Sequence, residues 1–476
     1  MITFDSISST NRLPGSQVEF SNVRAVIGLP AAVQKILLVG QRLTSGTVAQ
    51  LIPKRITQVE QGAAYFGRGS ILAGMVAAAL LANSATEMWA IGIDDNGAGT
   101  AATKTVTLSG TATAAGTLAL MVENVAVPVA VASGDTATAI GAAAAAAINA
   151  LADLPCTAAS VTGTVTLTFR HKGTAGNDLD VRVNHYEGPQ LPAGVTVAIA
   201  AGVTGATNPD LTTVWAAIGD EAYQQIALGI NDATNLTATD TELVSRFGPG
   251  RQNEGHAWAG LSGSFSTCSS FGATRNGIHV SLLPTNNSPT PPWKLAAAIT
   301  AIAAYYYQID PARPLTNIVL PGVIAPKVGA RFSDSELNQL LNAGISVWKV
   351  LPGGEVGIKR LVTTYQTNAY GFPDISWLDV STPMTLAYLR FSWRSMIAAK
   401  FPREKNTDAT RSAIRAETIA LARDWIDAGL IEDIDTFIAN LVVERSSSDP
   451  VQSNVLMTPN LVNGLLKSAA RIEFIL

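Results

Sequence analysis

The chain has 476 residues, of which 47% are hydrophobic and only 14% charged, so it is long and apolar enough to bury several cores. This composition excludes a disordered protein. The formal net charge of -4 provides no general attraction to nucleic acid or to anionic lipid, and we therefore expect neither as a direct partner.

Cysteine usage and hydropathy indicate the cellular compartment in which the protein is made. Cys156 and Cys268 are far apart in the sequence, which favours neither a disulfide framework nor a zinc site and fits a reducing environment. The start of the chain lacks the basic and then apolar pattern of a secretory signal. The most apolar runs, 75–82 and 142–148, are too short and too rich in alanine to span a bilayer. We expect a soluble protein made in the cytoplasm.

The first part of the chain has the pattern of an α/β domain. An apolar run at 35–40 and another at 88–93 are typical of buried strands, and small residues at 69–82 between them predict a helix. The turn signal at 94–97 closes this part. The order of strand, helix and strand predicts a parallel pair.

The composition changes from residue 98 to about residue 207, where small and β-branched residues dominate. Asp135 or Thr136 could cap an alanine-rich helix that runs to about residue 152. The segment 172–178 looks like the connection of a β-hairpin between the last two strands of this region. Strands are expected at 105–108, 118–122, 125–131, 165–169 and 179–183. The pattern predicts an inserted α+β domain.

The α/β pattern resumes after residue 208. Ser333 is a plausible cap of one helix, Thr382 of another that has Pro383 at its first position, and Pro459 is expected to open a last short helix. Further helices are expected at 213–219, 239–247, 293–307, 334–343 and 409–428. Strands are expected at 225–229, 277–282, 347–351, 356–365 and 441–445.

Both ends of the chain carry short alternating stretches that read as strands on tethers. Such strands could pair within one compact domain or could be donated to neighbouring subunits, and the pattern alone leaves both possibilities open. The residues involved are Ile2, Thr3, Phe4, Val18 and Phe20 near the start, and Arg471, Ile472, Glu473, Phe474, Ile475 and Leu476 at the end.

Catalytic patterns are poor, and we expect no catalytic, cofactor or metal site. The segment 260–264 misses the GxSxG nucleophile elbow at its last position, and no strand clearly leads into it. The segment 67–69 begins a GxG motif, but Leu72 replaces the third small residue, so a packing role at a helix start is expected. The four histidines are scattered, and Asp94–Asp95 reads as turn chemistry.

Several short motifs together point to a known family. They are GLP at 28–30, YFGRGS at 65–70, MWAI at 88–91, KGTAGND at 172–178, PPW at 291–293, DPARP at 310–314, LVTTYQTN at 361–368, YLR at 388–390, KFPR at 400–403, VER at 443–445, NLVN at 460–463 and the terminal strand. In their order and spacing, which span nearly the whole chain, the sequence resembles the contractile tail sheath proteins of Mu-like bacteriophages.

The resemblance implies a structural role without a cofactor. Subunits of this kind form stacked hexameric rings around a tail tube, exchange terminal strands with neighbours, and contract to drive the tube through the bacterial envelope during genome delivery. The implied partners are further copies of the chain, the tail tube protein, and the baseplate and tail terminator proteins. The implied location is the virion tail, after assembly in the host cytoplasm.

The resemblance also implies a multi-domain α/β fold, with the inserted domain outside and the C-terminal α/β portion nearest the tube. On the helix at 409–428 we expect Arg411, Arg415 and Asp424 to face the tube. The expected parts are an N-terminal arm (1–24), a central α/β core (25–97 and 208–400), the inserted β-rich domain (98–207), an inner α/β domain (401–469) and a C-terminal strand arm (470–476). The alternatives are the sheath of a tailocin or related injection system, and an α/β hydrolase with an inserted lid.

Overall fold

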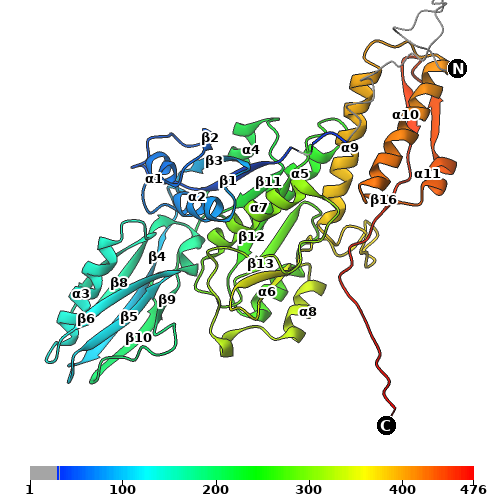
Figure 1. Ribbon diagram of the computed structural model, residues 1–476. Helices are drawn as coiled ribbons and strands as arrows, with labels where there is room; N and C mark the ends of the chain where they lie inside the picture. The colour runs from blue at the N-terminus through cyan, green and yellow to red at the C-terminus, as the bar shows by residue number, and fades with distance from the viewer. Residues whose placement is uncertain (1–28, 32, 476) are drawn as a thin grey trace, which may run out of the picture. The chain divides into compact units, whose positions relative to one another are not determined.

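The computed structural model describes residues 29–31 and 33–475, and the chain divides into two compact units (Figure 1). One unit comprises Ala32–Ala387 and Asn463–Leu476, and the other comprises Met1–Ala31 and Tyr388–Val462. The boundary between them falls within helix α9 (Ser381–Lys400). The predicted strand residues Ile2, Thr3, Phe4, Val18, Phe20 and Leu476 lie outside the described residues.

A six-stranded sheet forms the centre of the larger unit. Its order is β13-β12-β11-β1-β3-β2, and all neighbours are parallel except the edge strand β2, which is antiparallel. The predicted parallel pair is therefore confirmed, with β1 between β3 and β11. The strands are β1 (Lys35–Gln41), β2 (Lys54–Ile56), β3 (Glu87–Ile93), β11 (Gln225–Leu228), β12 (His256–Leu261) and β13 (Val280–Pro284).

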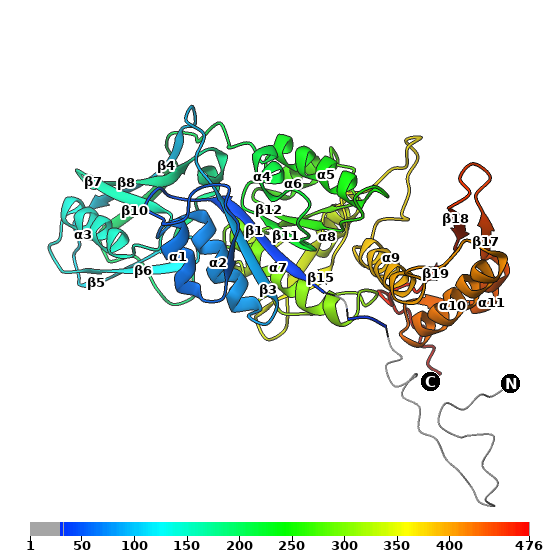
Figure 2. The ribbon, with the colours of Figure 1, turned by 90° about the horizontal axis from the view of Figure 1, so that it is seen from above.

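Helices cover both faces of this sheet, as the view in Figure 2 shows. In β1, Ile36 and Leu38 point into the core that contains α2 and α7, whereas Leu37 and Val39 point into the core beneath α5 and α8. A continuous apolar run is thus required, because both sides of the strand are buried. The helices are α1 (Val59–Phe66), α2 (Ile71–Ala82), α4 (Thr212–Ile218), α5 (Ala233–Phe247), α6 (Phe265–Gly272), α7 (Pro292–Ile309) and α8 (Asp334–Asn342).

The predicted inserted domain, residues 98–207, lies within the larger unit and forms two antiparallel sheets and one helix. The sheets have the orders β10-β4-β8-β7 and β6-β5-β9, and helix α3 is capped by the hydroxyl of Thr136, which accepts from Ala139 N. Its buried alanines lie against both sheets and allow close packing. The elements are β4 (Ala101–Gly110), β5 (Gly116–Val122), β6 (Val125–Val131), α3 (Ala137–Ala150), β7 (Cys156–Val161), β8 (Thr164–Lys172), β9 (Val181–Val183) and β10 (Val195–Ala201).

The expected hairpin connection at 172–178 is wrong. The segment forms a short 3-10 helix, η1 (Thr174–Asp178), and carries the chain from β8 in one sheet to β9 in the other. The side chain of Asn177 bonds to both the N–H and the carbonyl of Gly205, and Asn208 accepts from Thr174 N at 2.7 Å. The segment therefore does not form a hairpin turn, because these hydrogen bonds to residues distant in sequence fix its conformation.

The rest of the larger unit contains β14 (Val347–Val350), β15 (Val356–Arg360) and the short 3-10 helix η2 (Val328–Ala330). The predicted cap of α8 is confirmed, because Ser333 and Glu336 form a capping box. The prediction that Thr382 caps α9 is wrong, because the helix begins at Ser381 and Thr382 lies inside it. The N–H of Thr382 donates to Asp379 O at 3.0 Å and closes the turn earlier.

The smaller unit has its own core. Leu421 and Trp425 of α10 are buried, as is Phe437 of α11, and the indole of Trp425 donates to Ser392 Oγ at 3.0 Å. Its elements after α9 are α10 (Asp408–Asp427), β16 (Ile431–Glu432), α11 (Ile434–Asn440), β17 (Val442–Arg445), β18 (Ser453–Leu456) and β19 (Asn460–Leu461).

The helix expected after Pro459 is also wrong. Residues Asn460–Leu461 form β19, which pairs antiparallel with β16, and Val462 N donates to Leu430 O at 3.2 Å. The backbone hydrogen-bonding groups of this segment are thus satisfied by β16, which is distant in sequence, and not by hydrogen bonds within a helix. Among the residues that the structure describes, no helix is both long and apolar enough to cross a membrane.

Candidate assembly surfaces

The C-terminal segment 471–475 presents large apolar side chains to solvent. Ile472, Phe474 and Ile475 are 88%, 80% and 99% exposed, and these residues form no strand within the described chain. Arg471 and Glu473 form an ion pair with each other. Figure 1 shows the segment extended. Large exposed apolar groups that lie close together mark an interaction site, so this segment is a candidate for docking.

The strands β17 and β18 form a two-stranded antiparallel hairpin that offers a possible sheet edge. Val442 pairs with Leu456 and Arg445 with Ser453, and β17 packs against α10. Val442 and Leu456 are 44% and 57% exposed. In the described part of the chain no third strand joins this sheet. A two-stranded ribbon is marginally stable, and its outer edges carry backbone groups that can pair with another chain.

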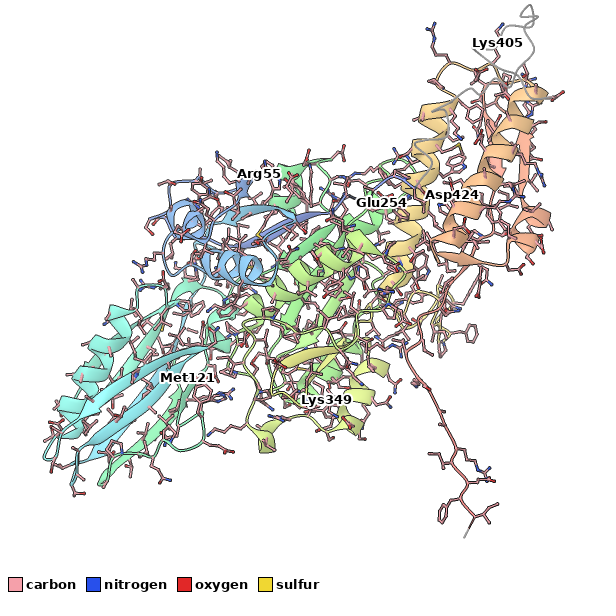
Figure 3. All side chains as sticks on the ribbon, viewed as in Figure 1. Arg55, Met121, Glu254, Lys349, Lys405 and Asp424 are labelled. Carbon is pink, nitrogen blue, oxygen red and sulfur yellow. The ribbon has the colours of Figure 1, made fainter. Side chains whose placement is uncertain are left out.

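Two of the three charged residues expected to face the tube form hydrogen bonds or ion pairs within their own unit. Arg411 pairs with Asp408 and donates to Asn406 Oδ1 at 2.7 Å, and Arg415 donates to Ile438 O at 3.0 Å. Asp424, labelled on α10 in Figure 3, is half-buried. Contact with a tube stays a prediction for these three residues.

A hydrogen-bond network joins the inserted domain to the central sheet. His171 Nε2 accepts from Ile71 N at 3.2 Å, which leaves His171 Nδ1 to donate to Asp95 Oδ1 at 2.8 Å. Asp95 also accepts from Gln41 Nε2 and from Lys172 N. Burial would raise the pKa of Asp95, but the hydrogen bonds from His171, Lys172 and Gln41 hold it below its usual value.

Sequence reasoning missed this network, because Asp95 was interpreted only as part of a turn. Its one local signal is the position of Asp95 two residues after the end of β3, in a region where parallel strands commonly present polar side chains. A second join is the pair Arg68–Asp153, with Arg68 Nε donating to Asp153 Oδ1 at 2.7 Å. The packing role predicted for the 67–69 segment is confirmed, since a Cβ on Gly69 would lie 2.8 Å from Leu154 O.

A buried carboxyl group lies where the inserted domain touches α7. Glu123 occupies the turn between β5 and β6 with φ 53°, is 0% exposed, and neither of its carboxylate oxygens has a hydrogen-bond partner. Lys294 Nζ lies 3.8 Å from Glu123 Oε2 and donates to Asn124 Oδ1 at 2.8 Å. Burial raises the pKa of Glu123 to about 7.

The prediction that no strand leads into the serine-containing segment 260–264 is wrong. A strand does lead into it, because β12 ends at Leu261 and α6 begins at Phe265. Ser262 lines a cavity of about 240 Å³, in which it hydrogen-bonds with Asp178, and burial raises the pKa of Asp178 to about 6. Burial also raises the pKa of Cys268, to about 11, so its thiol stays protonated at neutral pH.

The described residues around Ser262 lack the histidine of a serine hydrolase, and the group hydrogen-bonded to the hydroxyl is the carboxyl group of Asp178. The described residues that line the cavity are Thr174, Asn177, Asp178, Asn231, Asp232, Leu261, Ser262, Thr267, Cys268 and Phe271, and none of them is a histidine or a lysine. A histidine is the usual general base for a serine nucleophile, and in the described part of the chain the carboxylate of Asp178 is the one titratable group that an interaction places at this hydroxyl. Across residues 29–31 and 33–475, no group of three or more His, Cys, Asp or Glu side chains could hold a metal ion.

The histidines occupy separate structural positions. His256 is fully buried, with Nε2 at 2.8 Å from Ser281 Oγ, and burial holds its pKa well below its usual value. His279 packs against Phe247, and His185 against Tyr186. Each is explained by packing or by a local hydrogen bond.

The described residues thus combine a six-stranded, mostly parallel sheet, two antiparallel sheets of four and three strands, and exposed apolar side chains at 471–475. Residues 204–364 match the phage tail sheath protein central domain, and residues 373–475 match the phage tail sheath C-terminal domain. The chain is 37% identical over 486 residues to the Mu-like prophage FluMu tail sheath protein of Haemophilus influenzae, with 100% of each chain covered. The chain therefore belongs to the phage tail sheath family, in its Mu-like branch, and the resemblance seen in the sequence is confirmed.

Solved structures of sheath tail proteins are also similar. The protein from Desulfitobacterium hafniense is 14% identical and has a TM-score of 0.48, with 94% of this chain and 100% of that chain covered. The protein from Listeria innocua is 12% identical and has a TM-score of 0.49, with 91% and 96% covered.

Proposed function

We propose that this chain is the structural subunit of a contractile phage tail sheath. Its copies form stacked hexameric rings around a tail tube, and shortening of the stack drives the tube through the bacterial envelope. The observation that carries the proposal is similarity to a tail sheath protein along the whole length of both chains. The tube, baseplate and tail terminator proteins are the expected partners, in a virion tail assembled in the host cytoplasm.

Strand donation between copies supplies the connection. The segment 471–476 of one copy adds a third strand to the β17–β18 hairpin of another copy. The hairpin contributes unpaired edges and exposed apolar groups at Val442 and Leu456, and the donated strand contributes Ile472 and Phe474. Main-chain hydrogen bonds provide affinity in this mode, and alternate side chains provide specificity.

One donated strand binds only modestly. Each new hydrogen bond contributes about 0.5 to 1.5 kcal/mol and each buried apolar side chain about 1.5 to 3 kcal/mol, while ordering costs about 1 to 2 kcal/mol per residue. These opposing terms are similar in size for a strand of this length. Many linked copies gain from effective concentration, so the rings assemble cooperatively.

Contact with the tube is proposed for α10. Arg411 and Arg415 are bonded to neighbours in their own unit, so reversal of their charge would disturb that unit as well as any partner. Asp424 forms the cleaner probe. We expect Asp424→Lys to leave the thermal midpoint unchanged and to weaken co-sedimentation with tail tubes, and unaltered tube decoration would remove α10 from the tube contact.

Deletion of residues 471–476 tests strand donation. The truncated chain should remain folded by circular dichroism but form no tubes in negative-stain images, because its connecting strand is missing. As a matched pair, Ile472→Ser with Phe474→Ser should prevent tubes, whereas Arg471→Ser with Glu473→Ser on the opposite strand face should permit them. Normal long tubes from the truncated chain would rule out strand donation.

A further inference from the structure

The chain just before the C-terminal strand is held against the larger unit by two residues. Gly464 lies so close to Pro314 that a Cβ at this position would be 2.8 Å from Pro314 Cγ. Leu466 is half-buried and lines a narrow crevice, whereas Leu465 between them is 84% exposed. The alternation of inward and outward residues is that of an extended segment lying on a surface.

The crevice that Leu466 helps to line has buried residues in its wall. Tyr307 and Leu361 in its wall are 1% and 5% exposed. Arg360 donates two hydrogen bonds to Asp379, at 2.9 and 3.0 Å, and thereby ties the end of β15 to the start of α9. The residues lining the crevice are Tyr307, Pro314, Leu315, Thr316, Arg360, Leu361, Asp379, Ser381 and Leu466. A fixed surface of this kind can define where an arm begins.

We propose that Gly464 and Leu466 form an anchor that sets the point from which the C-terminal strand leaves its subunit. This inference rests on the proposed function and specifies how the strand is presented. Beyond the anchor, only residues 467–470 separate Leu466 from the strand, and four residues reach about 14 Å at most. The acceptor of this strand is therefore a directly adjacent copy of the chain.

The anchor shortens the tether. Without it, the last backbone hydrogen bond before the strand is that of Val462 to Leu430, and the free chain would comprise residues 463–470. The tether would thus double in length. Because the probability that the ends of a chain meet falls with the three-halves power of its length, the effective concentration of each strand would drop about threefold.

Substitutions at three consecutive positions test the anchor. Gly464→Ala places a methyl group against the Pro314 ring, and φ at Gly464 is not positive, so the backbone itself accepts alanine. Leu466→Ala removes the half-buried side chain from the wall of the crevice, and Leu465→Ala is the matched control. Pro314→Ala combined with Gly464→Ala should restore the contact by making room for the methyl group.

Two measurements follow for each variant: trypsin cleavage after Lys467 in the unassembled protein, and the critical concentration for polymer formation by sedimentation. We expect Gly464→Ala and Leu466→Ala to be cleaved several-fold faster and to need about a threefold higher concentration, with Leu465→Ala and the combined variant near wild type. Wild-type cleavage and assembly in Leu466→Ala would overturn the anchor. If the wild-type chain formed no polymer, the proposed function would fail instead, and the cleavage rates would decide on the anchor.

Discussion

Replacement of Glu123 by glutamine should make the protein more stable at alkaline pH. The Glu123 carboxyl group is fully buried, and Lys294 Nζ at 3.8 Å is too far away to satisfy it by a hydrogen bond. Burial raises the pKa to about 7 from 4.5, Lys294 opposes this, and Asp180 adds to it. The folded protein therefore favours the protonated acid.

The sign of the pH dependence follows from this shift. Below pH 4.5, the carboxyl group is protonated in the folded and unfolded states, and it does not affect the balance between them. Between pH 4.5 and about 7, the unfolded chain loses the proton while the folded chain keeps it, so stability falls as pH rises. At about 1.4 kcal/mol per pKa unit, the loss reaches about 3 kcal/mol above pH 7.

Urea unfolding of wild type and Glu123→Gln at pH 5 and pH 8 measures this effect. The two proteins should differ little at pH 5, and the glutamine variant should be more stable by about 3 kcal/mol at pH 8, because glutamine cannot ionise. Asp153→Asn, at an exposed carboxyl group, is the control and should show no comparable change with pH. A glutamine variant that is less stable than wild type at pH 8 would mean that Lys294 holds Glu123 ionised, and the folded protein would not favour the protonated acid.

Further predictions concern the core and the join between domains. His171→Ala should destabilise the folded state by about 3 kcal/mol, because Asp95 and the N–H of Ile71 lose a buried partner, whereas Asp153→Ala at the exposed pair with Arg68 should change it by less than about 1 kcal/mol. Leu38→Ala should lose about 2 to 5 kcal/mol from cavity formation. Gly260→Ala should lose about 1 to 3 kcal/mol, because its Cβ would lie 2.2 Å from Pro292 O. Denaturant midpoints check all four, and equal midpoints for His171→Ala and Asp153→Ala would contradict the assigned join.

Local signals predicted much of the fold. The apolar run of β1 identifies a strand with two buried faces, and Ser333 with Glu336 identifies the start of α8, because both signals lie within a few residues. The segments 172–178 and 459–462 were predicted wrongly for the opposite reason. Their backbones are satisfied by Gly205, by Asn208 and by β16, and no pattern within the segment reveals such distant partners.

The assembly surfaces divide in the same way. The alternation at 471–475 is visible in the sequence, so a strand that pairs with another segment or subunit could be predicted. The anchor could not, because Pro314 and Leu361 are remote from Leu466 in sequence. Glu123 was missed for a related reason. Glu123 and Asn124 connect β5 to β6, and nothing in this local sequence reveals that the carboxyl group is buried near Lys294 of α7.

We propose that copies of this chain are linked by donated strands into sheath rings. An electron cryo-microscopy map of the purified full-length chain, assembled with tail tubes, tests it most directly. We expect stacked hexameric rings in which residues 471–476 of each copy form a third strand on the β17–β18 hairpin of an adjacent copy. Rings in which that hairpin has no third strand, or takes the strand of its own copy, would contradict it.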